Sequence, residues 1–113
     1  MRLVQYAPEA CEACPYIDSR THITSDEVGD KYTGVMIIGE APGVNEDRAG
    51  RPFVGESGGW LEALLDVAGL TKEDCYITNV CRCRPPGNKI TAKGIKFHRQ
   101  FVEAAIQEAK PSL

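Results

Sequence analysis

The sequence predicts an α/β fold: half of a doubly wound, three-layer α/β/α domain with a parallel βαβ core and a C-terminal helix. Two short apolar segments, 35–39 and 75–79, have the length and composition of buried strands. A loop and one helix separate them, as in a right-handed βαβ crossover. Because 113 residues form one small domain and two strands alone make no stable parallel sheet, we expect residues 1–113 to be a single, truncated domain.

The crossover helix is predicted over residues 58–68, with Ser57 as its N-cap and Gly69 just after its end. We expect one face to pack on the sheet, formed by Trp60, Leu61, Leu64, Leu65 and Ala68. A second helix is predicted over about 91–109, before Pro111. Its apolar stripe includes His98, among Ile95, Phe101, Val102, Ala105 and Ile106. Residues 40–55 are predicted as a loop, and the polar stretch before residue 34 has no regular pattern.

The composition, 42% hydrophobic and 26% charged, is that of a soluble globular protein. No apolar run approaches the roughly 20 residues of a membrane span, and the first residues do not resemble a secretory signal. We therefore expect a cytoplasmic protein with no membrane partner. Residues 1–75 hold six Lys or Arg and fourteen Asp or Glu, whereas residues 76–113 hold seven and two. The basic half indicates either a nucleic-acid contact or a solvated helix face.

The five cysteines indicate a metal or cluster site rather than disulfides. Their number is odd, and a reducing cytoplasm keeps thiols free. Cys11 and Cys14 form a Cys-x-x-Cys pair, and Cys83 follows much later in the chain. Metal ligation is thus the first hypothesis for these residues.

Two segments follow the predicted strands. Gly-Glu-Ala-Pro-Gly, residues 39–43, comes after the first strand, and Asn79 closes the second. Because the carboxyl ends of parallel strands meet at one edge, Glu40, Asn79 and the ring of Phe53 can surround a flat heterocycle; the alternative is a simple tight turn. Residues 79–88 carry two arginines and two prolines, which can bind phosphates or cap the domain.

Four motifs in order resemble the family 4 uracil-DNA glycosylases, which include phage domains associated with DNA polymerase. They are Gly-Glu-Ala-Pro-Gly (39–43), Gly-Arg-Pro-Phe-Val-Gly (50–55), Tyr-Ile-Thr-Asn-Val (76–80) and Cys-Arg-Pro-Pro-Gly-Asn (83–88). The resemblance extends from Cys11 to Pro111. It implies excision of uracil from DNA by hydrolysis of the N-glycosidic bond.

The resemblance also implies roles for individual residues. Backbone groups of Glu40, Ala41 and Pro42 line the uracil pocket, and Glu46 contributes to it. Phe53 stacks on the extruded base, and Asn79 reads its edge. Glu40 or Asn88 positions the attacking water.

The family's [4Fe–4S] cluster is held by four cysteines, and the resemblance assigns Cys11, Cys14 and Cys83 to three of these positions. His98 stands where the fourth cysteine would be. Imidazole replaces thiolate in some clusters, whereas three cysteines and one histidine also form a good zinc site. Alternatively, His98 is a core residue, and Cys81 is the fourth ligand. We expect Cys75 to pack as a small apolar residue on its strand.

The family's later histidine motif and duplex-wedging loop have no counterpart here, so we expect weak or no excision by this chain alone, and whether it is an enzyme stays open. The alternative function is a non-catalytic, metal- or cluster-containing DNA-binding or assembly module, for example a phage-encoded fragment of a DNA-polymerase-associated domain. The expected partners are uracil-containing DNA and a homo-oligomer or second chain covering an open edge beside residues 75–79. Five basic residues are expected to contact DNA phosphates: Arg82, Arg84, Lys89, Lys93 and Lys96.

Overall fold

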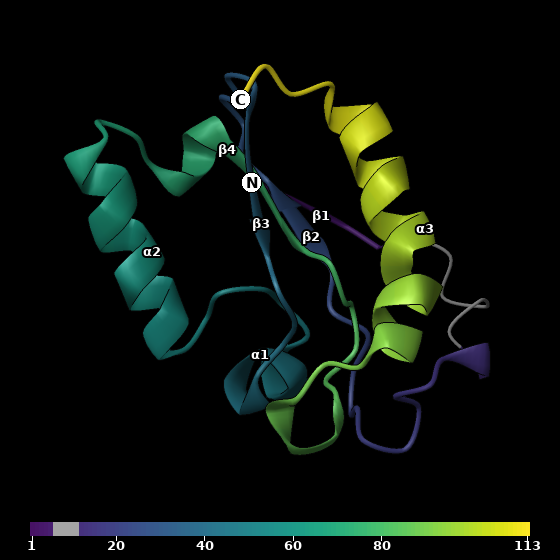
Figure 1. The fold of residues 1–113 in the computed structure, drawn as a ribbon. Coiled ribbons are helices and arrows are strands. Elements are labelled where there is room, and N and C mark those ends of the chain that lie inside the picture. The colour runs from purple at the N-terminus through teal and green to yellow at the C-terminus, as the bar shows by residue number, and fades with distance from the viewer. Residues whose placement is uncertain (6–11) are drawn as a thin grey trace.

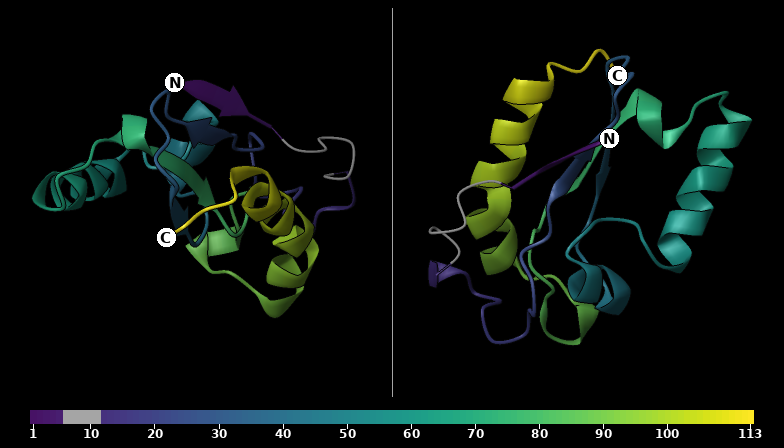
Figure 2. Two further views of the ribbon diagram at one scale, coloured as in Figure 1. Left: turned by 90° about the horizontal axis from the view of Figure 1, so that it is seen from above. Right: turned by 180° about the vertical axis from the view of Figure 1, so that it is seen from behind.

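The computed structural model describes residues 1–5 and 12–113 and has the predicted three layers. One sheet lies between helix α2 (Glu56–Val67) and helix α3 (Ala92–Ala109), which cover opposite faces (Figures 1 and 2). A short helix, α1 (Val44–Ala49), and two 3-10 turns, Lys72–Asp74 and Pro86–Asn88, lie in the connections. The predicted α/β/α class is therefore confirmed.

The sheet has four strands in the order β1-β2-β4-β3. Strands β3 (Val35–Gly39) and β4 (Cys75–Asn79) pair in parallel, from Val35 opposite Cys75 to Gly39 opposite Asn79. On the other side of β4 lies β2 (Asp26–Val28), which is antiparallel to both β4 and β1 (Arg2–Val4). Both predicted strands are thus confirmed with their bounds.

The prediction of an open edge beside residues 75–79 was wrong, because β2 covers that edge. The hydrophobic pattern missed β2 because two of its three residues, Asp26 and Glu27, are acidic and yet fully buried. Both carboxylates are paired with arginines, Asp26 with Arg82 and Glu27 with Arg51. Such pairing makes a buried charge tolerable. A search for alternating apolar residues cannot detect a strand that is buried in this way.

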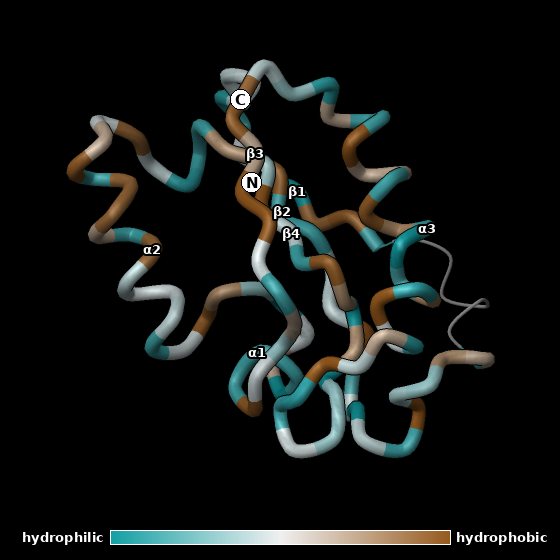
Figure 3. The backbone as a smooth tube through the Cα atoms, viewed as in Figure 1, coloured by the Kyte–Doolittle hydropathy of each residue, from teal (hydrophilic) through white to brown (hydrophobic). Residues whose placement is uncertain are grey.

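Alternate residues of β4 supply two cores. Tyr76 packs with Ala105 and Ala109 of α3, whereas Ile77 packs with Leu61 and Leu65 of α2. Figure 3 shows the hydrophobic character of β3 between these layers. The parallel pair thus has a helix on each face, but only β4 is buried along its whole length; β3 is half-buried, and its Ile38 is 43% exposed, so burial of β3 on both faces was predicted wrongly.

Helix α2 differs from its prediction in start and buried face. It starts at Glu56 with Gly55 as its N-cap, so Ser57 lies within the first turn. Leu61 and Leu65 are buried, but Trp60 and Leu64 are each 67% exposed. The helix therefore packs on a narrower stripe than the sequence indicated. The predicted loop 40–55 also contains α1, whose six residues are too few to show a helical period.

Helix α3 is capped by Thr91, whose hydroxyl accepts a hydrogen bond from the Gly94 amide. It buries His98, Phe101, Ala105 and Ala109, whereas Ile95 and Ile106 of the predicted stripe are 39% and 40% exposed. The Tyr16 hydroxyl accepts a bond from the Thr91 amide at 2.9 Å and lies against Gly94. The segment that carries Cys14 is thereby docked on the first turn of α3.

Gly94→Ala is expected to destabilise the protein by about 1–3 kcal/mol, because the new Cβ would overlap the buried Tyr16 hydroxyl. The matched control is Gly59→Ala in α2, where a Cβ has no neighbour within 4 Å. That change should stabilise the helix by roughly 0.5–1 kcal/mol. Urea unfolding of both variants measures the two effects, and equal effects would contradict the close packing at Gly94.

Candidate functional site

A crevice opens at the carboxyl ends of β3 and β4. It consists of two adjoining hollows of about 310 Å³ and 210 Å³ that share Glu40, Ala41, Glu46 and Ser57. The structure brings together all seven residues that the sequence assigned to a base pocket: Glu40, Ala41, Pro42, Glu46, Phe53, Asn79 and Asn88. Gly39, Gly43 and Ser57 also line it. Their motifs were recognised, but glycines and a presumed helix cap gave no sign of a lining role.

Gly39 forms the floor of the smaller hollow, where Phe53 and Asn79 meet. A Cβ at residue 39 would overlap the Asn79 side-chain oxygen and lie 2.6 Å from the Phe53 ring. Asn79 is buried, and Phe53 is half-buried against the core under α2. A side chain at residue 39 would therefore fill the space between ring and amide.

Glu46 holds the loop that carries Phe53. Its carboxylate accepts hydrogen bonds from the amides of Val54 at 3.1 Å, Gly55 at 2.9 Å and Gly43 at 3.1 Å. Burial alone would raise the pKa of Glu46, but these donors outweigh it and hold the pKa below its ordinary value. Phe53 itself has a left-handed backbone, with φ of 51°, which is costly for a residue with a side chain. The Glu46 contacts on the following two residues help to maintain it.

The two remaining polar residues are exposed at the rim. The Asn88 side-chain oxygen accepts a bond from the Arg84 guanidinium at 2.9 Å, so its NH₂ group remains for other partners. Glu40 follows β3 directly and lines both hollows. The crevice thus combines a carboxylate, two amides and an aromatic ring.

A second cluster lies behind the crevice, where Cys14, Cys83 and His98 are all buried. Their ligand atoms lie within 4.8 Å of one another, and Cys14 Sγ is 3.2 Å from His98 Nε2. The Arg82 amide donates to His98 Nδ1 at 3.1 Å, which leaves Nε2 facing the sulfur atoms. With Nδ1 accepting that bond, the proton of the neutral ring lies on Nε2, which can donate to Cys14 Sγ; Nε2 can bind a metal only once this proton has left it.

The surroundings of His98 favour its neutral form, the form in which histidine binds metals. Burial, aided by the positive charges of Arg82 and Arg20, lowers the pKa of His98 to about 4, so the ring is neutral near pH 7. Cys81 is not part of this group; burial raises the pKa of its thiol to about 11. Cys75 packs in the core on β4, as expected. Cys11 lies outside the described residues.

Arg82 does not lie at the surface, so its predicted contact with DNA phosphate was wrong. Its side chain is 3% exposed and pairs with Asp26 at 2.6 Å. The other four predicted contacts are open to solvent at least in part: Arg84, Lys89, Lys93 and Lys96. Within the described residues, no helix is long and apolar enough to cross a membrane.

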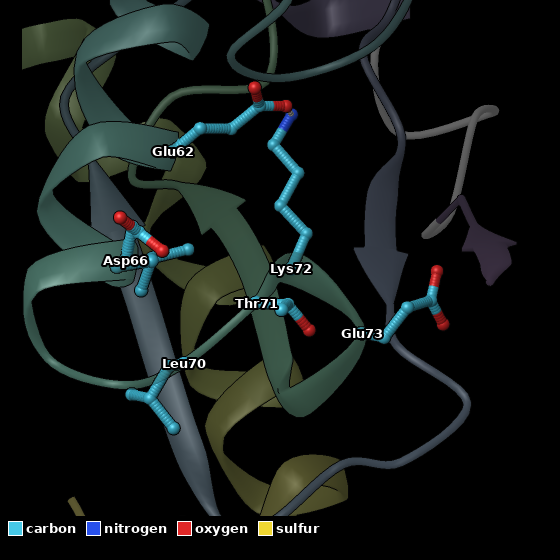
Figure 4. A pocket seen from close by; sticks show the side chains of 7 residues that line it. Glu62, Asp66, Leu70, Thr71, Lys72 and Glu73 are labelled. Carbon is cyan, nitrogen blue, oxygen red and sulfur yellow. Dashed lines mark ion pairs between the residues drawn. The ribbon is translucent and has the colours of Figure 1, made fainter.

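A third hollow, of about 330 Å³, lies at the opposite end of β4, between α2 and residues 70–73 (Figure 4). Lys72 pairs there with Glu62 at 3.6 Å and also donates to the Phe53 carbonyl at 3.3 Å. None of the predicted site residues lines this hollow. Its lining combines Leu65 and Leu70 with acidic residues, unlike the amide-rich crevice.

Glu46→Gln is expected to cost about 1–3 kcal/mol at pH 7, because three amides lose a charged acceptor. Since the folded pKa of Glu46 is lowered, its stabilisation is present above the ordinary glutamate pKa of about 4.3 and disappears as the pH falls through the folded value. Urea unfolding at pH 3–7 should therefore show a smaller acid loss for this variant than for the unchanged chain. The exposed Glu108→Gln serves as control and should retain the full pH dependence.

Comparison with known proteins assigns the chain to a family. Residues 27–113 match the uracil DNA glycosylase superfamily. The chain is 44% identical over 89 residues to the type-4 uracil-DNA glycosylase of Thermotoga maritima, covering 79% of this chain and 46% of that protein. Identity to the type-4 enzyme of Pyrobaculum aerophilum is 44% over 96 residues, covering 85% and 45%. With the type-5 enzyme of Thermus thermophilus it is 33% over 92 residues, covering 69% and 42%. The chain thus spans about half the length of these relatives, and it belongs to the uracil DNA glycosylase superfamily.

Proposed function

We propose that residues 1–113 form one half of a uracil-DNA glycosylase domain whose crevice receives a uracil extruded from DNA in the cytoplasm. The observation that carries this proposal is the convergence of Glu40, Phe53, Asn79 and Asn88 on the two adjoining hollows of one crevice, at the ends of two parallel strands. An extruded base needs a stacking surface and edge hydrogen bonds, and these residues offer both. The buried thiols of Cys14 and Cys81 suit a reducing compartment.

In the proposed complex, Phe53 stacks on the uracil ring and Asn79 reads its edge. The amide offers one donor and one acceptor, which complement the O4 and N3–H groups of uracil. Cytosine presents the opposite order of donor and acceptor at these two positions. A buried amide whose orientation is held would therefore discriminate between them.

For the reaction, we propose that water adds to C1′ of the deoxyribose while the N1–C1′ bond breaks and uracil leaves as an anion. Glu40 is the group that can accept the water proton, because a carboxylate is a base and the neutral amide of Asn88 is not. The backbone N–H groups of Glu40 and Ala41 would stabilise the leaving anion, since Pro42 has none and that of Gly43 is bonded to Glu46. Asn88 would donate a hydrogen bond to the water or the sugar.

The proposed metal ligands are Cys11, Cys14, Cys83 and His98, with a [4Fe–4S] cluster as the group held and zinc as the alternative. Support comes from the gathering of three of these residues in a buried cluster and from the type-4 relatives. When bound, the group would cross-link the segment around Cys14 to the strand end and α3. Its contribution is thus to folding rather than to bond cleavage.

We also propose that a homo-oligomer or second chain completes the sheet at β3, whose outer edge is occupied only near its start in the described residues. The Leu113 amide donates to the Gly34 carbonyl at 3.1 Å, and the Met36 amide donates to the Leu113 carbonyl at 2.9 Å. This is the bond pattern of a parallel bridge, at the point where the segment after α3 reaches β3 (Figure 1). A two-fold related copy would pair β3 with itself in the antiparallel direction, so a second chain that supplies a parallel strand fits better.

A non-catalytic DNA-binding module is the second candidate. The chain has two histidines; His98 lies in the metal cluster, and His22 bonds to the Asp47 carbonyl at 2.7 Å. Neither lines the crevice, so neither can stabilise a leaving uracil anion there. This arrangement favours binding of uracil-containing DNA with little cleavage.

Binding of matched single-stranded oligonucleotides that differ in one uracil or cytosine tests the proposed function. We expect a preference for uracil that falls by about tenfold in Asn79→Ala, because the edge contacts are lost. The exposed Asn45→Ala is the control and should leave the preference unchanged. Equal binding of both oligonucleotides by the unchanged chain would contradict uracil recognition. Alkaline cleavage of abasic sites in the same samples measures excision, which we expect to be slow or undetectable.

Metal analysis of protein purified without oxygen tests the second site. We expect iron with sulfide, or zinc, at a constant ratio to protein, and near-complete loss of it in Cys83→Ser. His98→Ala should weaken binding, whereas His98→Cys should restore it, because a thiolate would occupy the same position. Absence of both iron and zinc from the unchanged protein would contradict the proposal.

A further inference from the structure

We propose that Arg82 is a positioning residue that couples the metal centre to the base-reading amide of Asn79. The inference rests on the proposed function for the identity of the ligand, but the coupling itself concerns the chain alone. It starts from a five-residue segment, 79–83, which has Asn79 in the crevice at one end and Cys83 in the metal cluster at the other. Arg82 stands next to Cys83 and reaches back to Asn79.

The main chain of Arg82 is held from two sides. Its amide donates to Nδ1 of His98 at 3.1 Å. Its carbonyl accepts bonds from both the amide and the hydroxyl of Thr24, at 2.8 Å and 3.0 Å. The position of the Arg82 backbone is thus linked directly to the ring whose other nitrogen faces Cys14.

The side chain of Arg82 continues this connection to the crevice. Its Nε donates to the Asn79 carbonyl at 2.9 Å, and Nη1 donates to Asp26 at 2.6 Å. Asp26 is fully buried and also accepts bonds from the hydroxyls of Tyr76 and Thr78 on β4. The guanidinium therefore holds the main chain at Asn79, the last residue of β4, against the neighbouring strand β2.

Asn79 in turn is followed by two amides that tie segment 79–83 to the end of β3. Val80 donates to the Gly39 carbonyl at 2.9 Å, and Cys81 donates to the Glu40 carbonyl at 3.0 Å. A displacement of segment 79–83 would consequently move the Asn79 amide relative to Gly39 and Glu40. The metal centre and the base pocket thus lie at the two ends of one hydrogen-bonded segment, so that order at one end favours order at the other.

The planar guanidinium is the feature on which this coupling depends. Its Nε and Nη1 point in fixed directions, so one side chain bonds the Asn79 carbonyl and the Asp26 carboxylate together. Lysine keeps the charge that Asp26 requires but has a single ammonium group, which cannot reproduce both directions. Arg82→Lys therefore separates positioning from the simple burial of a charge pair.

Hydrogen exchange of the intact, metal-loaded protein is the first test. In Arg82→Lys we expect the amides of Val80 and Cys81 to exchange at least about tenfold faster, while those of β1 and β2 and the metal content stay unchanged. Removal of the metal with a chelator should accelerate the same two amides in the unchanged chain, and by much less in Arg82→Lys. Asp26→Asn, which leaves the Nε contact with Asn79 in place, should change them in the same direction by less. Exchange that is unaltered in both variants would overturn the proposal.

The matched control is Arg84→Lys, since Arg84 lies two residues further along and bonds Asn88 outside the segment. This variant should leave the exchange of Val80 and Cys81 unchanged. If it accelerates them as much as Arg82→Lys does, any nearby arginine contributes equally and the assignment to Arg82 is wrong.

Binding of the uracil and cytosine oligonucleotides is the second measurement. Arg82→Lys should lower the preference for uracil by about tenfold with cytosine binding unchanged, whereas Arg84→Lys should weaken both without altering their ratio. Loss of metal together with both affinities would indicate a purely structural role and overturn the proposal. If the unchanged chain shows no preference for uracil, the proposed function fails, and the exchange data still decide whether Arg82 couples the two sites.

Discussion

The parallel pairing of β3 and β4 is the constraint on which the site depends. Its last pair places Gly39 opposite Asn79, so a residue without a side chain lies next to a buried amide. Both strands end at this edge of the sheet, and the crevice is formed where the chain continues beyond them. A shift of one residue in the register would turn Asn79 to the other face of the sheet and bring a different residue over the floor.

The sequence predicted those parts of the fold that depend on apolar patterns and on the glycine, proline and capping residues that begin or end an element. Strands β3 and β4 were found with their bounds because each is a short, nearly continuous apolar or β-branched run. Strand β2 could not be found in this way, since its place in the sheet depends on ion pairs with Arg82 and Arg51, which are distant in sequence. The same ion pair explains why Arg82 was misassigned to the surface, because a charge count cannot show which cation is buried.

The pocket residues were predicted through motifs, and the structure shows why the motifs work together. Glu46 was expected beside the base, and it does line the crevice, yet its oxygens are engaged with Gly43, Val54 and Gly55. The sequence shows that a carboxylate is present but not which amides will bond to it, since that depends on the path of the loop that carries Val54 and Gly55. The exposed faces of Trp60 and Leu64 were similarly beyond prediction, because amphipathic spacing does not reveal how much of a helix face the sheet covers.

Two adjacent carboxylates explain how the walls of an open crevice stay ordered. While Glu46 binds the loop before α2, Asp47 accepts bonds from the amides of Thr21 and His22 at 2.8–3.0 Å and so fixes the segment that follows Cys14. Burial would raise the pKa of Asp47, but these amides lower it below its ordinary value. Hydrogen bonds to the main chain hold both loops without placing bulky side chains in the space between them. A small domain can thus keep a cavity near its strand ends, where apolar packing of the same loops would have closed it.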